Sequence, residues 1–175
     1  RQAWRAIQAG LPLDAIISSD IGNNCAIGNA YPTFEKGRKY LAPGLFGPCG
    51  YGFPAIIGAK IGNPDTPCVG FAGDGAFGIS MNEMSSIGRK EWPGITMVIF
   101  RNFQWGAEKR NSILWYDNNF VGTELDPELS YAKVAEGCGL KGVTVKTQAE
   151  LTDALRQSCE AQKKGTTTCI EVILN

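Results

Sequence analysis

Hydrophobic residues along this chain form short continuous runs that alternate with longer stretches of helical spacing. Ile95–Phe100 is the clearest run, continuous and rich in β-branched residues, which is typical of a buried strand. The helical stretches have apolar residues three or four positions apart. Strands are expected at residues 14–18, 39–42, 67–72, 95–100, 143–146 and 167–174. Helices are expected at residues 1–9, 23–30, 54–61, 77–89, 129–137 and 148–163.

Strands separated by helices of this length predict an α/β fold, a parallel sheet of about six strands with helices on both faces. Ligands of such sheets bind at the carboxyl ends of the strands. Residues 1–175 contain no repeat and no linker, which predicts a single domain. The chain does not begin with Met, and we expect it to be a fragment of a longer enzyme.

Composition narrows the class of protein. Hydrophobic residues make up 43% of the chain, and 17 basic residues balance 17 acidic ones. This balance argues against a nucleic-acid partner or a membrane surface. The uncharged run at residues 41–59 is long enough to cross a bilayer. Its three prolines and five glycines predict instead a buried loop that enters a helix.

The six cysteines are at least ten residues apart, and the chain has no histidine. These spacings do not fit a zinc site. We expect reduced thiols and a cytoplasmic location, with secretion and disulfides as the alternative.

A glycine-rich turn follows the strand expected at residues 67–72. Gly73–Gly78 matches the GxGxxG pattern of dinucleotide sites, and it also fits a plain tight turn. Asp74 argues against a dinucleotide, because its carboxylate would lie beside a pyrophosphate of the same charge. The acidic residue expected at the end of the next strand is also missing, since that strand ends in Arg101 and Asn102.

A magnesium ion would turn Asp74 from an obstacle into a ligand. Mg²⁺ prefers about six oxygen ligands, with one or two from carboxylates and others from amides and phosphates. Asn102 follows the neighbouring strand and offers an amide oxygen, although such an Asn is more often a strand-end cap. The backbone amides of Gly75 and Ala76 open a helix, where they can hold phosphate oxygens.

Gly73-Asp74-Gly75, followed by Asn102, resembles the diphosphate-binding motif of thiamine diphosphate enzymes. Residues 44–55 look like the glycine-rich turn that grips the cofactor's aminopyrimidine in acetolactate synthases and pyruvate oxidases, and residues 19–24 look like their earlier diphosphate loop. The resemblance covers nearly the whole chain, with three motifs in order. Residues 18–25, 46–50 and 102–110 most resemble one acyltransferase branch.

The resemblance implies a role for each matching residue. Asp74, Asn102 and the carbonyl of Gln104 would bind Mg²⁺. Gly73 belongs to the motif. Gly75, Ala76, Asn23 and Asn24 would hold the diphosphate. Gly47 and Cys49 would contact the aminopyrimidine, with Cys49 also at the place of an apolar wedge that bends the cofactor. Glu108 falls where related decarboxylases keep an active-site acid.

Three positions depart from the family pattern. Arg101 replaces the first residue of an Asn-Asn pair, Asn23-Asn24 replaces a frequent Gln-His pair, and Cys49 is smaller than the usual wedge. Taken alone, Cys49 is interpreted as a small buried apolar residue. Glu108, Lys109 and Arg110 are interpreted first as a solvated charged turn, although the two cations could meet an anionic substrate.

Trp105, Trp115 and Tyr116 are expected to form a pocket wall or an interface. The family implies that a glutamate from a pyrimidine-binding domain, usually on a partner subunit, activates the cofactor. The isolated chain is therefore predicted to be inactive, and the full enzyme to be a homodimer or homotetramer. The resemblance implies a small aldehyde and phosphate as substrates. Acetolactate synthase or decarboxylase chemistry, a nicotinamide dehydrogenase and a non-catalytic binding domain remain as alternatives.

Overall fold

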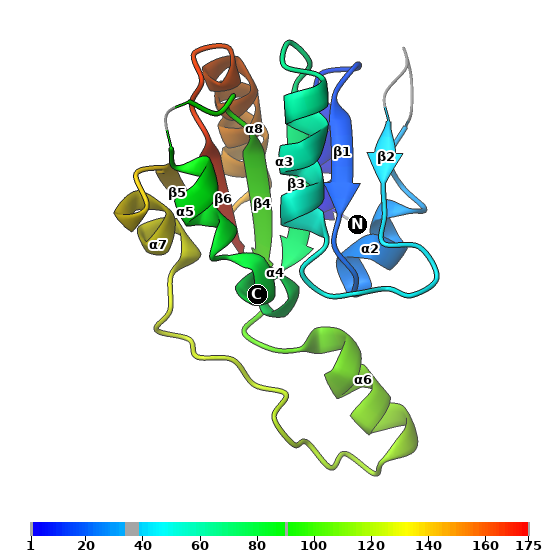
Figure 1. Ribbon diagram of the computed structural model, residues 1–175. Helices are drawn as coiled ribbons and strands as arrows, with labels where there is room; N and C mark the ends of the chain where they lie inside the picture. Colours follow the sequence, from blue (N-terminus) through cyan, green and yellow to red (C-terminus); the bar gives the residue numbers. More distant parts are fainter. Residues whose placement is uncertain (1, 34–38, 90, 175) are drawn as a thin grey trace.

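The computed structural model describes residues 2–33, 39–89 and 91–174, and it confirms the α/β fold. Six parallel strands form one sheet in the order β2-β1-β3-β4-β6-β5 (Figure 1). The strands are β1 (Ile16–Ser19), β2 (Tyr40–Leu41), β3 (Cys68–Gly73), β4 (Thr96–Arg101), β5 (Lys141–Val145) and β6 (Thr168–Ile173). The helices are α1 (Gln2–Gly10), α2 (Asn23–Gly28), α3 (Gly52–Gly62), α4 (Asp74–Ser80), α5 (Glu83–Ile87), α6 (Gly106–Trp115), α7 (Tyr131–Gly137) and α8 (Gln148–Gln162).

Helices cover both faces of the sheet, as predicted. Side chains of α1 and α8, such as Trp4 and Leu155, pack on one face against Phe71 and Val98. Helices α3, α4, α5 and α7 pack on the other face, in front of the sheet in Figure 1. Each strand of the sheet centre therefore supplies buried side chains to two cores, which explains why β3 and β4 are continuous apolar runs.

The order of the strands determines where a ligand can bind. The chain runs from β1 outward to β2 and then returns to β3 on the other side of β1. Helix α2, which follows β1, packs toward the core of α1, whereas α4, which follows β3, packs in the opposite core. The loops after β1 and β3 thus diverge at a topological switch point, the usual ligand site of such sheets.

Two of the expected elements are wrong. The helix expected at residues 77–89 begins earlier, at Asp74, and divides into α4 and α5 at a turn that contains Met81 and Asn82. The charged turn expected at Glu108–Arg110 is part of α6. No residue of α6 is buried among the described residues, so no apolar stripe marks this helix in the sequence.

Smaller differences concern boundaries. β1 and β5 begin two residues away from their expected starts, and α7 begins at Tyr131 because the Ser130 hydroxyl caps the helix. Arg1, where the first helix was expected to begin, lies outside the described residues. Most of the uncharged run at residues 41–59 forms turns and then enters α3, as predicted. The expectation of a buried loop is wrong, because no residue of these turns is buried and the side chains of Leu45 and Phe46 are exposed. Within the described ranges, no helix has the length and apolar character needed to cross a membrane. All six cysteines have free thiols.

Candidate functional site

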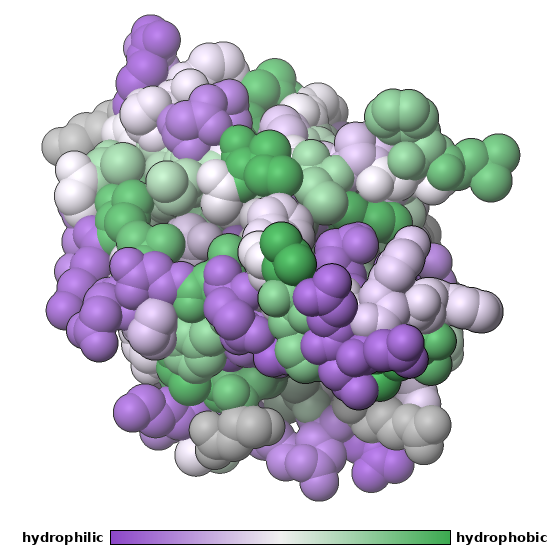
Figure 2. Space-filling model, turned by 90° about the horizontal axis from the view of Figure 1, so that it is seen from below, coloured by the Kyte–Doolittle hydropathy of each residue, from purple (hydrophilic) through white to green (hydrophobic). Residues whose placement is uncertain are grey.

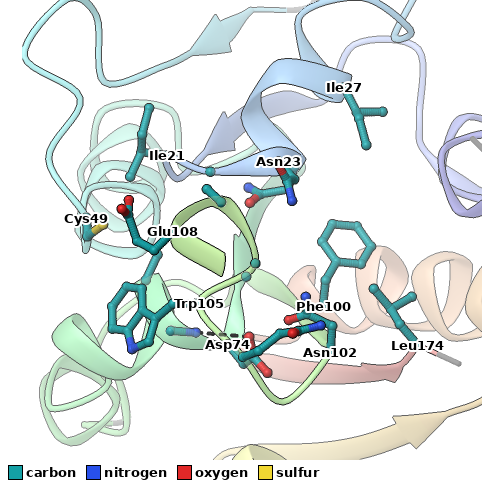
Figure 3. Close-up of a pocket in the computed structure, with 18 of the residues that line it drawn as sticks. Ile21, Asn23, Ile27, Cys49, Asp74, Phe100, Asn102, Trp105, Glu108 and Leu174 are labelled. Carbon is teal, nitrogen blue, oxygen red and sulfur yellow. Dashed lines mark hydrogen bonds between the residues drawn. The ribbon is translucent and has the colours of Figure 1, made fainter. Parts of the chain in front are cut away.

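A pocket of about 330 Å³ lies at the carboxyl ends of β1, β3 and β4, between these strands and α6 (Figure 3). Helix α6 and the loop after it extend beyond the strand ends (Figure 1). The structure brings every predicted site residue to the lining of this pocket: Asn23, Asn24, Gly47, Cys49, Gly73, Asp74, Gly75, Ala76, Asn102, Gln104 and Glu108. The predicted residues therefore share one site although they come from five separate segments of the chain.

Asp74 is the most enclosed acidic group of the pocket, with 1% of its surface exposed. Its Oδ2 accepts a hydrogen bond of 2.7 Å from the backbone N–H of Phe103, and its Oδ1 accepts one of 3.1 Å from that of Gly75. Burial raises the pKa of Asp74, while these two N–H groups and Arg101 lower it. The hydrogen bonds fix the carboxylate in place at the end of β3.

Asn102 and Gln104 direct two further polar groups to the same point. The terminal atom of the Asn102 amide that faces Asp74 lies 3.1 Å from Asp74 Oδ1 and 3.0 Å from the Gln104 carbonyl oxygen. With oxygen in this position, three oxygens converge, and a cation among them is needed to offset their repulsion. With nitrogen in this position, the amide donates hydrogen bonds to both neighbours.

This donor set fits Mg²⁺. Adjacent oxygens of an ideal magnesium octahedron are about 3 Å apart, given metal–oxygen distances of 2.0–2.1 Å. The two distances from the Asn102 amide, to Asp74 Oδ1 and to the Gln104 carbonyl oxygen, match this spacing within about 0.2 Å. We call these three residues the metal end of the pocket.

Phe103 gives the metal end its shape. It has a positive φ of 60°, which is uncommon for a residue with a bulky side chain. Its N–H is bonded to Asp74, and its carbonyl accepts a hydrogen bond of 2.9 Å from Leu125. This conformation turns the chain between Asn102 and Gln104, so that both face Asp74. Strained backbone of this kind is typical of functional sites.

The expected diphosphate contacts surround the metal end. The Gly75 amide is bonded to Asp74, and a Cβ at Gly75 would lie 2.7 Å from the Trp105 ring, so only glycine fits under this indole. Asn24 donates to the Asp20 carbonyl and to the Ser19 hydroxyl, which makes it a support of its own loop. Asn23 and Ala76 line the pocket directly.

Asp20 supports the site from outside the pocket lining, and the sequence analysis assigned it no role. Its side chain is fully buried and accepts hydrogen bonds from the backbone N–H groups of Ile21, Gly50 and Gly52, at 2.9, 3.0 and 2.7 Å. Burial raises the pKa of Asp20, and these N–H groups oppose the shift. Asp20 thereby joins the loop after β1 to the glycine-rich turn. A charged residue directly after an apolar strand was the available signal.

The opposite end of the pocket is open. It consists of Gly47, Cys49 and Glu108, which we call the pyrimidine end; Figure 3 shows Glu108 beside Cys49. Gly47 has a φ of 57°, a conformation that suits glycine. Cys49 and Glu108 are exposed, which contradicts the interpretation of Cys49 as buried. Partial burial raises the pKa of Cys49, and the charges of Asp20 and Glu108 raise it further.

The charged and aromatic residues in and beside α6 differ in how far they are exposed and paired. Lys109 Nζ lies 2.5 Å from Glu124 Oε1 and over the Phe120 ring, so its charge is already paired. Arg110 is exposed. Trp105 lines the pocket as a wall residue, whereas Trp115 and Tyr116 are exposed.

Comparison with known proteins places this geometry in a family. Residues 20–172 match the family described as thiamine pyrophosphate enzyme, C-terminal TPP binding domain; thiamine pyrophosphate is another name for thiamine diphosphate. The chain is similar to a Rhizobium meliloti protein named probable sulfoacetaldehyde acetyltransferase (79% identity over 100% of this chain and 30% of the relative). A sulfoacetaldehyde acetyltransferase of Roseovarius nubinhibens is 73% identical over 100% of this chain and 29% of its own length.

The fold has a solved counterpart in the same family. A thiamine diphosphate-dependent 4-hydroxybenzoylformate decarboxylase of Rhodococcus jostii RHA1 superposes with a TM-score of 0.85 and 26% identity, over 99% of this chain and 32% of that one. The chain thus spans about 30% of the length of the curated relatives. Since the family match covers most of the chain and includes the metal end, the chain belongs to the thiamine pyrophosphate enzymes, in which it corresponds to the C-terminal TPP-binding domain.

Proposed function

We propose that the chain is the cofactor-binding domain of a sulfoacetaldehyde acetyltransferase and that it binds thiamine diphosphate through Mg²⁺. The identities of 79% and 73% support this enzyme over other members of the family. The observation that carries the metal assignment is the convergence of Asp74, Asn102 and Gln104 on one point. The acyltransferase branch that residues 18–25, 46–50 and 102–110 resemble is this one.

The proposed reaction converts sulfoacetaldehyde and phosphate to acetyl phosphate and sulfite. When bound, the cofactor would supply a carbanion as the nucleophile for this chemistry. The residues of this chain anchor and orient it. Asp74, Asn102 and Gln104 would hold the metal, Asn23 and Ala76 the diphosphate, and Gly47 and Cys49 the aminopyrimidine. Glu108 stands beside the open end, where it would meet the substrate.

The open pyrimidine end supports the proposal that a second domain completes the site. Hydrophobic groups are interspersed with hydrophilic ones across the face that carries the pocket (Figure 2). Leu45 and Phe46, which directly precede Gly47 of the pyrimidine end, are large hydrophobic residues with exposed side chains, as are Trp115 and Val121. Adjacent exposed hydrophobic residues such as Leu45 and Phe46 commonly mark an interface. A pyrimidine-binding domain of a partner subunit, in a homodimer or homotetramer, is the proposed cover. We further propose that the chain is one domain of this longer enzyme and, from its free thiols, that the enzyme is cytoplasmic.

Other functions are less well supported. Acetolactate synthases share the family, but the Saccharomyces cerevisiae catalytic subunit is only 29% identical over 81% of this chain. A nicotinamide dehydrogenase would place the carboxylate of Asp74 against a pyrophosphate without a cation. A non-catalytic domain would leave the strained turn at Phe103 without a function.

The test is a calorimetric titration of the chain with thiamine diphosphate, with and without Mg²⁺. Binding is expected to require the metal and to disappear in Asp74→Ala, a loss of more than about 100-fold, because a metal ligand is removed. Equal binding with and without Mg²⁺, or wild-type binding by Asp74→Ala, would refute the assignment. The isolated chain is expected to show no turnover of sulfoacetaldehyde, and turnover by it alone would show that no second domain is needed.

A further inference from the structure

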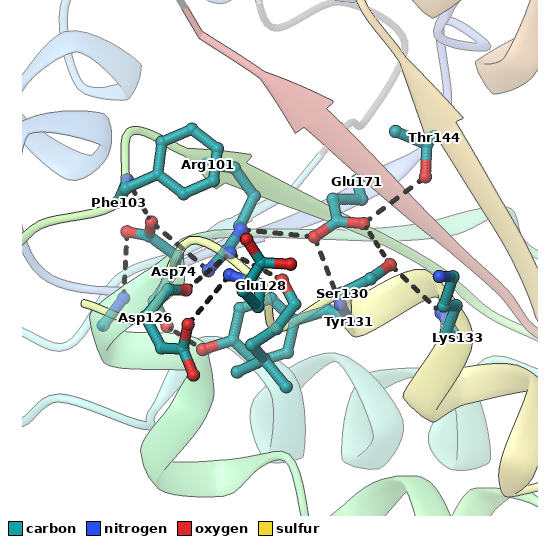
Figure 4. A network of polar contacts seen from close by, with 12 residues as sticks. Asp74, Arg101, Phe103, Asp126, Glu128, Ser130, Tyr131, Lys133, Thr144 and Glu171 are labelled. Atoms are coloured by element: carbon teal, nitrogen blue, oxygen red, sulfur yellow. Dashed lines mark hydrogen bonds and ion pairs between the residues drawn. The ribbon is translucent and has the colours of Figure 1, made fainter.

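Two charged side chains, Arg101 and Glu171, lie behind Asp74 of the metal end, in the interior of the domain (Figure 4). Arg101 at the end of β4 is 1% exposed, Asp74 is 1% exposed and Glu171 in β6 is 2% exposed. Arg101 Nη1 lies 3.7 Å from Asp74 Oδ2, and Arg101 Nε lies 3.2 Å from Glu171 Oε1. One buried cation therefore stands between two carboxylates, of which only Asp74 is a proposed metal ligand.

Arg101 also contacts the segments that shape the metal end. Its Nη2 donates hydrogen bonds of 2.6 Å to the Leu129 carbonyl and 3.2 Å to the Asp126 carbonyl. Its guanidinium carbon lies 4.6 Å from the centre of the Phe103 ring, which belongs to the strained turn. Among the described residues, Arg101 Nε and Nη1 have no hydrogen-bond acceptor in suitable geometry. Toward Asp74 and Glu171, Arg101 therefore acts through its charge.

Glu171 is held in place by other groups. Its Oε2 accepts a hydrogen bond of 2.8 Å from the Ser130 hydroxyl, and its Oε1 accepts one of 3.1 Å from the Tyr131 N–H. Glu171 is not among the residues that line the pocket. Glu171 therefore does not contact a metal in this pocket directly, and Arg101 is the charged group that lies between Glu171 and Asp74.

The signs of the charges on Arg101, Asp74 and Glu171 determine how Glu171 affects metal binding. A guanidinium beside Asp74 attracts the same carboxylate that has to bind a divalent cation, and it repels the cation itself. This repulsion is strong in a site removed from water. A second carboxylate on the far side of Arg101 cancels most of its field and draws the guanidinium away from Asp74.

We propose that Arg101 and Glu171 are positioning residues of the metal site: Arg101 braces the turn that carries the ligands, and Glu171 neutralises Arg101 so that Asp74 remains available to Mg²⁺. This inference rests on the proposed function of the site. It assigns a role to the position where the family motif has asparagine and this chain has arginine.

The decisive variant is Glu171→Gln, which keeps the size of the side chain and an oxygen that can accept hydrogen bonds but removes its charge. Within the described part of the chain, Arg101 then has Asp74 as its only counter-ion. We expect Mg²⁺ to bind about 10- to 100-fold more weakly, the usual effect of changing an outer partner of a metal ligand. Thr144→Val is the matched control, because it removes a 3.4 Å hydrogen bond to Glu171 and leaves all three charges.

A second variant separates charge from structure. Arg101→Met combined with Glu171→Gln removes both charges at similar volume, a change that buried ion pairs often tolerate. If Glu171 acts by neutralising Arg101, the double variant should bind Mg²⁺ at least about five-fold more tightly than Glu171→Gln alone, although it lacks the brace.

The measurement is a calorimetric Mg²⁺ titration at saturating thiamine diphosphate, with the melting temperature as a check of folding. It uses the longer protein of which we propose this chain to be a part. Wild-type Mg²⁺ affinity in Glu171→Gln, or a double variant as weak as the single one, would overturn the inference. Should Glu171→Gln fail to fold, the double variant decides: affinity within about tenfold of wild type supports the inference, and a greater loss overturns it. If wild type itself binds the cofactor without Mg²⁺, the proposed function fails instead.

Discussion

At the metal end of the pocket, Asp74 is 1% exposed and bonded to two backbone N–H groups, whereas Cys49 and Glu108 at the pyrimidine end are exposed. The metal end is formed by the tips of the central strands β3 and β4 and by the turn that follows β4. The pyrimidine end is formed by a glycine-rich turn and the first turn of α6, which has no buried residue within the described chain.

This difference separates the ligand-binding groups that one domain can supply from those that a neighbouring domain has to supply. Binding of a metal and a diphosphate needs fixed oxygens and N–H groups, and the carboxyl edge of a parallel sheet provides them within one chain. Recognition of a flat ring needs contacts on both faces, and a single turn covers only one. The metal end should therefore retain its properties in the isolated chain, and the pyrimidine end should depend on its neighbours.

The largest effect on stability is expected at Asp20, the buried carboxylate that supports the glycine-rich turn of the pyrimidine end. In Asp20→Asn, the new amide has one acceptor oxygen for three N–H groups and presents an N–H₂ group to the others. We expect a loss of about 1–3 kcal/mol in the free energy of unfolding. Thermal or urea denaturation measures it, with the exposed Asp14→Asn as a control expected to change stability by less than about 0.5 kcal/mol.

The stability difference between wild type and Asp20→Asn should also depend on pH. Burial raises the pKa of Asp20 above its ordinary 3.8, so the folded state keeps this proton to a higher pH than the unfolded chain does. Wild-type stability from this group is therefore greatest below about pH 4 and falls as pH rises through the raised pKa. The difference in the free energy of unfolding between wild type and Asp20→Asn should be larger near pH 4 than at pH 7. A stability difference that increases toward pH 7 would contradict a raised pKa of Asp20.

Gly106→Ala is expected to disturb the metal end without unfolding the domain. A Cβ at Gly106 would lie 2.8 Å from the Asn102 amide, so this side chain must rotate away from Asp74. We expect Mg²⁺ binding about tenfold weaker and a melting temperature that is not lowered, because alanine favours a helix over glycine. Calorimetry and a thermal scan measure the two quantities.

Gly58→Ala in α3 is the matched control for Gly106→Ala, since no atom lies within 4 Å of its added Cβ. It should raise stability by up to about 1 kcal/mol and leave Mg²⁺ binding unchanged. Equal Mg²⁺ affinities in the two variants would mean that Asn102 is not a ligand.

The two ends also differ in how far the sequence could predict them. Asp74 and Asn102 directly follow or end buried apolar strands, and the ends of adjacent parallel strands must meet, so their proximity could be predicted. The same signal marks Asp20, but neither the role of Asp20 nor the left-handed conformation of Phe103 could be assigned from it. Their roles arise from hydrogen bonds to residues 29 to 32 positions away, which no local pattern encodes.

The same reasoning applies to the secondary structure. The strands and the helices on both faces could be predicted because buried faces leave a periodic pattern. Helix α6 left none, because its residues pack against no core of the described chain. The break between α4 and α5 was also missed, since Phe77, Met81 and Met84 continue the helical spacing across it and pack in one core.

The smallest effect on the domain is expected from Glu108→Gln. Glu108 is exposed, and among the residues that the structure describes its side chain has no buried partner to lose. Stability should therefore change by less than about 0.5 kcal/mol, and Mg²⁺-dependent cofactor binding should be unchanged. The charge of Glu108 raises the pKa of Cys49, so its removal should lower that pKa and increase the thiolate fraction. Cys49 should then react faster with iodoacetamide at pH 8, by about twofold, whereas Glu136→Gln on α7 should leave the rate unchanged.

An unchanged rate in Glu108→Gln would mean that Glu108 does not face the pyrimidine end in solution. A faster reaction together with lost turnover in the longer protein would place this acid beside the substrate and outside the cofactor's anchor.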